Sequence, residues 1–426
     1  MITTNFFLIN TLKRYLFIYR PLILVVLLNI VSAFGFALSL SAIPISFSNY
    51  GQTIILEKIK DNDYQIKNSH RFRLTNRIVV KTTLTTTKQQ IRNLHPSLLK
   101  VTELYRMEKG AYFVIDINSV NEIAEVIKQL SKSTIILQIQ PDLLQKTVRN
   151  SHLRNKDNKN HYISKLNIDH FWEKTKGKGV KIAIIDDGFD LGHEDLQSTK
   201  TDFSYDIETM TLEVSPKTKI DNHGTQVMGI IFAQHNEIGT DGIAPESSLI
   251  AIRHTDTWTS KTILSFYLAK LAKADVINCS WLLPFLLEPV ETVVNDLIRT
   301  GRSGKGTAVI FAAGNQGKPL NDKQNETGIE DAIIVGSSNL SNQRLQFSNY
   351  GKYVNVYTLG LKIWTTSVVK TRPYVQFSGT SASAAIISGL VALLIADNKE
   401  LVLKDIVPTL KHYFKILESP TIFQNR

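Results

Sequence analysis

From about residue 162 onward, short and continuous apolar runs alternate with segments of helical periodicity. The runs are rich in valine and isoleucine. They occupy residues 180–185, 248–253, 276–280, 308–312 and 332–335. Such runs are typical of strands that are buried on both faces of a parallel sheet. The pattern predicts an α/β fold, with a mostly parallel sheet flanked by helices, over residues 162–426.

A separate and smaller α+β unit is predicted between residues 50 and 145. It contains four strand-like runs and two helical segments. The strand-like runs occupy residues 77–81, 100–106, 111–117 and 135–140. The order strand-helix-strand-strand-helix-strand is that of a ferredoxin-like fold, and Pro141 is expected to end the last strand.

Residues 146–161 differ from both neighbours because they contain almost no apolar side chains. This composition predicts a solvated linker. A proteolytic cut would find an accessible chain there.

The N-terminal segment combines basic residues with a long apolar stretch. Lys13, Arg14 and Arg20 precede the apolar residues 21–45. The basic flank is expected to stay in the cytoplasm while the rest of the chain is exported. Two alternatives remain for residues 1–46: a cleaved signal peptide, favoured by small residues near its end, or an uncleaved membrane anchor.

The net charge of +11 raises the possibility of a nucleic-acid binder. However, the basic residues are scattered and no nucleic-acid-binding signature accompanies them. We therefore expect a solvated basic surface and no nucleic-acid partner. The single cysteine, Cys279, excludes an intramolecular disulfide and lies in an apolar run that predicts burial.

Three polar side chains stand where the predicted elements meet. Asp186 ends an apolar strand, His223 opens a helix, and Ser381 begins a long apolar helix. In open α/β sheets such strand ends form the site, and helix N-termini stabilise anions. Each alone has an ordinary structural explanation, as a turn, an exposed histidine or a helix cap.

Together, the three stretches resemble the subtilisin-like serine peptidase family. They are residues 186–188 (Asp-Asp-Gly), 223–229 (His-Gly-Thr-Gln-Val-Met-Gly) and 379–381 (Gly-Thr-Ser). Their order along the chain differs from that of α/β-hydrolases and chymotrypsin-like enzymes. The resemblance covers about residues 162–415, and it makes the upstream α+β unit similar to the family's propeptide.

The resemblance implies a role for each of four residues. Ser381 attacks the peptide carbonyl, His223 transfers the proton, and Asp186 orients His223. The Asn315 side-chain amide stabilises the oxyanion together with the Ser381 backbone N–H. The side chain of Asp187 is expected to point away from the site, because neighbouring residues on a strand alternate.

The resemblance also implies a substrate pocket and a calcium site. The pocket would be flanked by two segments, Ser280, Trp281 and Leu282, and Ala312, Ala313 and Gly314. Leu282 replaces a glycine that is usual in the family, so it is expected to narrow the pocket or shift the peptide. Calcium would be bound by the side chains of Asp195 and Asn236 and by the carbonyls of Gln234, Ile238 and Thr240. An ordinary polar loop is the alternative to the calcium site.

The sequence thus predicts an exported serine endopeptidase that is activated by removal of its N-terminal unit. The expected partners are a peptide or protein substrate, the chain's own propeptide, and a membrane if the anchor is retained. We expect a monomer whose chemistry needs no cofactor. A catalytically silent binding protein on the same scaffold is the alternative, which the intact Asp186, His223, Ser381 and Asn315 disfavour.

Overall fold

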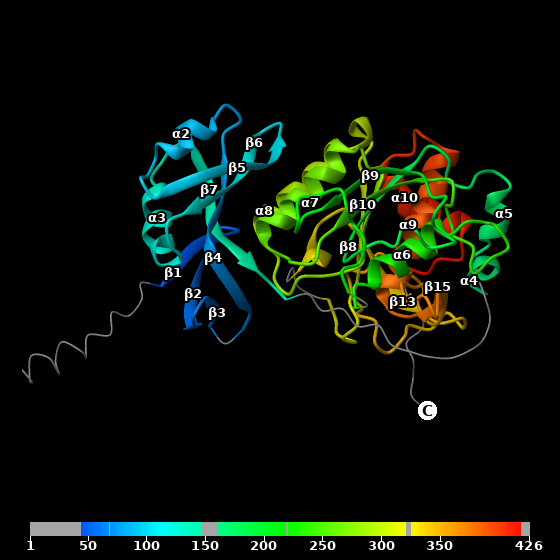
Figure 1. Cartoon of the computed structure of the whole chain (residues 1–426). Helices are drawn as coiled ribbons and strands as arrows, with labels where there is room; N and C mark the ends of the chain where they lie inside the picture. The colour runs from blue at the N-terminus through cyan, green and yellow to red at the C-terminus, as the bar shows by residue number, and fades with distance from the viewer. Residues whose placement is uncertain (1–43, 68, 147–160, 219, 321–324, 419–426) are drawn as a thin grey trace, which may run out of the picture. The chain divides into compact units, whose positions relative to one another are not determined.

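The computed structural model describes residues 44–67, 69–146, 161–218, 220–320 and 325–418. The predicted signal peptide or anchor and most of the predicted linker lie outside these residues. From Ile45 onward the chain forms one compact unit, and its elements are labelled in Figure 1. Ile45 and Ser46, which we assigned to the segment 1–46, instead begin the first strand.

The N-terminal part contains a seven-stranded sheet in the order β1-β2-β3-β4-β6-β5, with β7 paired to β4. All of its strand pairs are antiparallel. The strands are β1 (Ile45–Asn49), β2 (Gln52–Lys60), β3 (Asp63–Ile66), β4 (Arg71–Thr82), β5 (Leu98–Met107), β6 (Gly110–Ile117) and β7 (Ile136–Leu144).

Two helices, α2 (Lys88–Arg92) and α3 (Ile123–Leu130), complete this part. The elements from β4 to β7 follow the order βαββαβ. Strands β1 to β3 were not predicted. Strand β2 contains the short apolar run 54–56, but it buries only Leu56 and shows no strict alternation along its length. Strand β1 does bury alternate residues, but its first two residues belong to the segment that we assigned to export.

The prediction that Pro141 ends the last strand was wrong. Strand β7 continues to Leu144, and Pro141 lies opposite Ile78. The register of β4 shifts between Leu74 and Ile78, next to this pair. A proline, which donates no backbone hydrogen bond, is tolerated at such an irregularity.

The C-terminal part is built on a parallel seven-stranded sheet in the order β14-β13-β12-β11-β8-β10-β9. The strands are β8 (Lys181–Asp186), β9 (Thr201–Asp206), β10 (Ser248–Arg253), β11 (Val276–Cys279), β12 (Ala308–Ala312), β13 (Ile333–Ser338) and β14 (Val356–Leu359). The five predicted apolar runs correspond to β8 and to β10 through β13. A separate antiparallel pair joins β15 (Ile363–Thr366) and β16 (Tyr374–Phe377).

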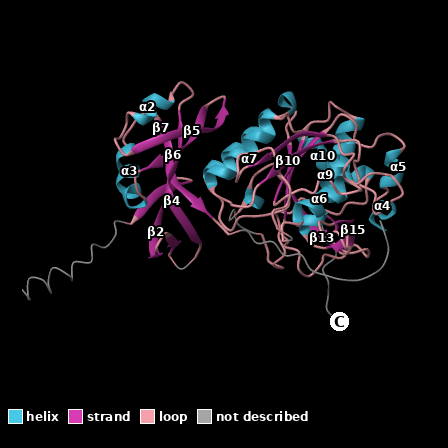
Figure 2. Cartoon of the chain, viewed as in Figure 1, coloured by secondary structure: helices cyan, strands magenta, loops and turns pink. Residues whose placement is uncertain are grey.

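Helices cover both faces of this sheet (Figure 2). The helices of this part are α4 (His161–Lys165), α5 (Ile168–Trp172), α6 (His223–Phe232), α7 (Thr259–Leu271), α8 (Glu288–Thr300), α9 (Thr380–Asp397) and α10 (Leu403–Tyr413). Alternate residues of one strand enter different apolar clusters: Ile277 joins the cluster that contains α7 and α8, and Val276 joins the one that contains α9. The central sheet is therefore buried on both faces, as its continuous apolar strands predict.

Helix α9 is the main core helix of this part. It packs against β11, β12, β13 and β14 and against α6. Among the described residues it is the one helix long and apolar enough to cross a membrane, with a mean hydropathy of 1.7, but 89% of that stretch is buried inside the protein. Its apolar length is thus explained by burial in the core, and its first residues are fixed at the end of the sheet.

Candidate active site

Asp186 and His223 form a buried pair. Asp186 is the last residue of β8 and His223 is the first residue of α6. Both carboxylate oxygens of Asp186 lie 2.9 Å from Nδ1 of His223. Asp186 is fully buried and His223 is 8% exposed. The ring of Phe377 packs edge-on against the imidazole, with 5.3 Å between the ring centroids. The imidazole of His223 is therefore held by Asp186 and by Phe377.

The neighbouring Asp187 has a different position. Its Oδ1 accepts a hydrogen bond of 2.8 Å from the backbone N–H of Gly224, at the start of α6. A Cβ at Gly224 would lie 2.5 Å from the carbonyl oxygen of Gly188, so only glycine allows this close approach. The two carboxylates therefore point to different partners, and Asp186 is the one that contacts the imidazole.

Ser381 lies in the first turn of α9. Gly379, just before the helix, has a φ of 133°, which a residue with a side chain rarely adopts. This turn presents Ser381 at the helix N-terminus, where backbone N–H groups have no intrahelical partner. The hydroxyl of Ser381 donates a 3.0 Å hydrogen bond to the carbonyl oxygen of Ser280.

The side chain of Asn315 is oriented by Thr380. Its amide oxygen accepts hydrogen bonds from the backbone N–H of Thr380 (2.9 Å) and from the Thr380 hydroxyl (3.0 Å). The Thr380 hydroxyl also accepts from the backbone N–H of Gly314 (3.0 Å). Because its oxygen is held in this way, the Asn315 amide has its NH₂ group left for a ligand.

Ser381 and Asn315 line the same pocket, of about 100 Å³. Five further predicted residues line it: Ser280, Trp281, Leu282, Ala312 and Gly314. The residues that we did not predict are Leu283, Pro284, Gln316, Asn325 and Thr380. A Cβ at Gly314 would lie 3.3 Å from the Leu282 side chain, so these two lining residues are neighbours in the wall. That Leu282 narrows the pocket or shifts the peptide stays a prediction.

Ala313 is the predicted pocket residue that the structure does not bring to the pocket. Its backbone N–H donates to Val335 (2.9 Å), and its carbonyl accepts from the Asn349 amide (2.9 Å). Ala313 is fully buried. It supports the segment that carries Gly314 and Asn315 and does not line the pocket.

Glu326 is a notable residue that the sequence analysis missed. It follows Asn325 at the pocket wall and begins a short 3-10 helix, η3 (Glu326–Gly328). Its side chain is fully buried, and Oε2 accepts a 2.9 Å hydrogen bond from the backbone N–H of Leu283. Burial raises the pKa of the Glu326 carboxyl to about 8. Because its sequence neighbours are polar, nothing in the pattern indicates burial.

The predicted calcium ligands are only partly arranged around one point. Asp195 is fully buried, and its Oδ2 accepts a 3.1 Å hydrogen bond from the backbone N–H of Thr240. Within the described part of the chain, its Oδ1 has no hydrogen-bond partner. The side chain of Asn236 instead accepts from the backbone N–H of Ile238 (3.0 Å). No group of three or more His, Cys, Asp or Glu side chains that suits a metal occurs among the described residues, so a site here would depend on backbone carbonyls.

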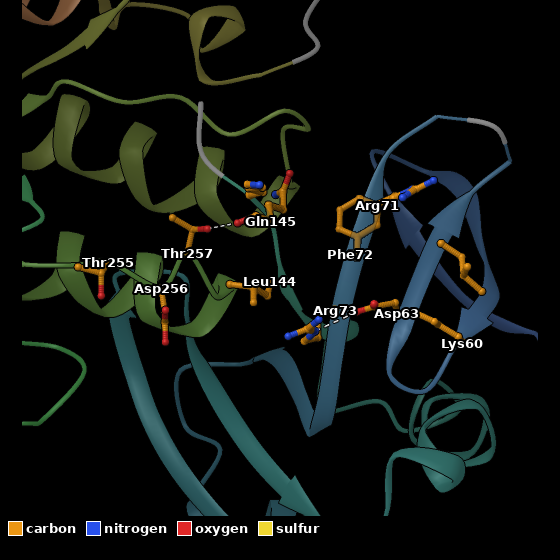
Figure 3. A pocket seen from close by; sticks show the side chains of 12 residues that line it. Lys60, Asp63, Arg71, Phe72, Arg73, Leu144, Gln145, Thr255, Asp256 and Thr257 are labelled. Atoms are coloured by element: carbon orange, nitrogen blue, oxygen red, sulfur yellow. Dashed lines mark hydrogen bonds and ion pairs between the residues drawn. The ribbon is translucent and has the colours of Figure 1, made fainter. Parts of the chain in front are cut away.

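The end of the N-terminal part lies against the pocket segment. The amide group of Gln145 donates to the carbonyl oxygen of Phe285 and accepts from its N–H, both at 3.0 Å. Phe285 directly follows Pro284, which lines the pocket. The backbone carbonyl of Gln145 accepts a hydrogen bond from the Thr257 hydroxyl (Figure 3). The preceding residue, Leu144, forms an antiparallel bridge with Trp258.

Comparison with known proteins agrees with this geometry. The model of the subtilase family matches residues 177–415, which is more than half of the chain. A thermophilic serine proteinase of Bacillus sp. (strain AK1) is 33% identical over 237 residues, which cover 54% of this chain and 56% of that protein. A calcium-dependent protease of Trichormus variabilis is 30% identical over 278 residues, or 55% of this chain and 41% of that protein. The chain thus spans about half the length of the curated relatives it matches.

The fold is also found among solved structures. The epidermin leader peptide processing serine protease of Staphylococcus aureus aligns with a TM-score of 0.63 and 17% identity, covering 79% of this chain and 92% of that one. At this identity the match concerns the fold, which is subtilisin-like. With the family match over most of the C-terminal part, the chain belongs to the subtilase family.

Proposed function

We propose that the protein is a serine endopeptidase that hydrolyses peptide bonds through an acyl-enzyme on Ser381. The observation that carries this proposal is the buried pair of Asp186 and His223, with the carboxylate 2.9 Å from Nδ1. A carboxylate on Nδ1 leaves Nε2 as the nitrogen that can accept a proton. Phe377, which contacts the imidazole, lies four residues before Ser381 in the chain.

The proton transfer begins with a reorientation of the Ser381 hydroxyl. In the substrate-free chain this hydroxyl donates to the carbonyl oxygen of Ser280. It must turn toward Nε2 of His223 when the peptide binds, which is common because catalytic hydrogen bonds tighten only in the substrate complex. His223 then takes the proton, Asp186 stabilises the imidazolium, and His223 returns the proton to the leaving amine.

Two donors are available for the oxyanion of the tetrahedral intermediate. One is the NH₂ group of Asn315, whose carbonyl oxygen is held by Thr380. The other is the backbone N–H of Ser381 at the start of α9. Because both donors are fixed before the reaction, they cost no reorganisation when negative charge develops.

Replacing Asn315 with alanine is expected to lower kcat by roughly 10²–10³, the loss known for the corresponding donor in subtilisin, a member of the same family. KM should change little, because this donor acts mainly on the transition state. The measurement is steady-state hydrolysis of a fluorogenic peptide by the processed enzyme. An unchanged kcat would contradict the role of Asn315, and an inactive wild-type protein would contradict the endopeptidase function.

The N-terminal part is proposed to act as a propeptide in cis. Two of its side chains cap helices of the C-terminal part. Asp142 accepts from the N–H (2.9 Å) and the hydroxyl (2.7 Å) of Ser260 in the first turn of α7. Asn49 accepts from the N–H of Glu288 at the start of α8 (2.9 Å). These caps satisfy helix N–H groups that otherwise have no partner, which supports a role in folding.

Calcium is proposed as a structural ion near Asp195. The fit rests on the fully buried carboxylate, whose Oδ1 has no hydrogen-bond partner in the described ranges. Burial raises the pKa of Asp195 to about 6. Asp195 and the carbonyls of Gln234, Ile238 and Thr240 would hold the ion. The ion would neutralise the buried charge of Asp195 and link it to the loop of residues 234–240. The chemistry itself does not require the ion.

This proposal predicts a calcium effect that depends on pH. Without calcium, the folded carboxyl has a pKa of about 6 against an ordinary value of 3.8. The native state therefore holds the proton more tightly than the unfolded state, and stability falls as the pH rises from about 4 to 6. Saturating calcium should raise Tm by roughly 5 °C at pH 8 and by much less at pH 5, where the proton competes with the ion.

Calorimetry of ion-stripped Ser381→Ala protein, which cannot digest itself, checks this result. The matched control is Asp195→Asn in the same background, which should lose the calcium response at pH 8. Magnesium at the same concentration controls for ionic strength. Equal Tm values with and without calcium at pH 8 would remove calcium from the account.

Export remains a proposal that is supported by the basic and apolar N-terminal segment. An exported enzyme is expected to meet peptide or protein substrates outside the cytoplasm, either released or tethered to the membrane. Fractionation of cells that express the full chain would distinguish the two fates. Recovery of the protein in the cytosol would contradict both.

A further inference from the structure

The pocket beside Ser381 has an acidic residue behind its wall. Asn325 lines the pocket, and Glu326 follows it directly. The Glu326 carboxylate accepts the N–H of Leu283, a second lining residue, at 2.9 Å. The carboxyl is thus connected to two parts of the pocket wall. One is the segment after β11, through the hydrogen bond to Leu283, and the other is the loop before η3, through the chain to Asn325.

The environment of this carboxyl is unusual for a structural residue. It is fully buried, and over the described ranges Oε1 has no hydrogen-bond partner and no lysine, arginine or histidine forms an ion pair with Glu326. An acid buried in this way destabilises the fold unless its charge or hydrogen-bonding capacity is satisfied. Burial raises the pKa of this carboxyl to about 8, and a donor or a cation next to Oε1 would favour its charged form.

A substrate side chain can supply that partner. Arginine and lysine are donors without acceptors, and arginine retains its charge even in a partly buried site. Their methylene stems pack on apolar surface, which Leu282 and Trp281 provide in the pocket wall. Glu326 is fully buried behind the lining residues, so a long side chain must displace part of the wall to reach the carboxyl.

We propose that Glu326 determines specificity, and that the pocket accepts arginine or lysine as the residue before the scissile bond. This inference rests on the proposed endopeptidase function. The competing outcome is that the narrow pocket accepts only small neutral side chains, such as alanine. The two outcomes differ in the charge of the preferred substrate and are separated by one set of peptides.

The experiment uses fluorogenic peptides that differ only in the residue before the cleaved bond: arginine, lysine, citrulline, alanine, leucine or phenylalanine. Citrulline has nearly the shape of arginine without its charge. For the processed wild-type enzyme, kcat/KM for arginine should exceed that for citrulline by roughly 10- to 100-fold or more. Glu326→Gln should reduce this ratio to a few-fold.

Glu330→Gln is the matched control, because Glu330 belongs to the same segment, is exposed, and its loss changes the net charge equally. It should keep the arginine preference. Equal rates for arginine and citrulline in the wild-type enzyme would overturn the proposal without any variant, and so would an arginine preference that survives Glu326→Gln. If no peptide and no denatured protein is hydrolysed, the endopeptidase function itself fails, and the pocket assignment fails with it.

Discussion

Replacing Ser381 with alanine should leave the chain uncut, whereas the wild-type chain should lose its N-terminal part. The proposed cut needs the nucleophile, and alanine removes only the hydroxyl. The backbone of α9 and the contacts of the N-terminal part with the rest of the chain should be preserved. We expect the mature N-terminus to fall between about residues 140 and 165, in or next to the polar segment that follows Gln145.

The contacts around Gln145 explain why a cut is expected there. Its side-chain amide is joined to Phe285, next to the pocket wall, by two hydrogen bonds of 3.0 Å. Its carbonyl oxygen accepts from the Thr257 hydroxyl, and Leu144 bridges Trp258. The last described residues of the N-terminal part therefore lie beside the segment that lines the pocket of Ser381, which is why the proposed cut is expected close to them.

Intact mass spectrometry of the purified proteins, with other proteases inhibited, measures the outcome. Ser341→Ala is the matched control, since Ser341 is exposed and its side chain has no proposed role. This control should be processed like the wild type. Processing of Ser381→Ala at the same position would assign the cut to another protease. An uncut wild-type chain would make the N-terminal part a permanent domain.

The proposed catalytic groups could be picked out from the sequence because they lie at the ends of recognisable elements. Asp186 ends a fully apolar strand, and Ser381 begins an apolar core helix, so their places at the end of the sheet follow from the pattern. Strand alternation predicted that Asp187 points away from the site. The structure instead places its carboxylate on the backbone N–H of Gly224, next to His223, so both carboxylates contact the start of α6 but only Asp186 contacts the imidazole.

Other features could not be predicted because they depend on contacts between distant residues. The two hydrogen bonds between Gln145 and Phe285 join residues that are 140 positions apart, and neither residue belongs to a recognisable sequence motif. Strand β2 exposes most of its side chains, so its sequence shows no strict alternation of apolar and polar residues. Glu326 stands among polar residues that look like a surface loop, yet its side chain is fully buried.

The position of Ala313 shows a limit of assigning pocket residues from a family resemblance one whole segment at a time. The segment that carries Asn315 does line the pocket through Ala312 and Gly314. The backbone of Ala313 is instead engaged with Val335 and Asn349, on the interior side. Membership of a segment thus predicts the place of a pocket wall, but not which side chains face it.

A serine that is activated by His223 should react with a fluorophosphonate, which forms a covalent bond to a nucleophilic oxygen. An ordinary serine hydroxyl is too weak a nucleophile, so labelling reports the proton transfer to His223. Removal of the base by His223→Ala should abolish labelling while the fold is retained. His170→Ala, which removes an exposed imidazole, should label like the wild type.

Mapping the fluorophosphonate adduct by tandem mass spectrometry of the processed protein tests the central claim most directly. The account predicts a single modified residue, Ser381, in the wild type and in His170→Ala, and no modified residue in His223→Ala. Modification of a different serine, or equal labelling of Ser381 in His223→Ala, would contradict the catalytic triad of Asp186, His223 and Ser381.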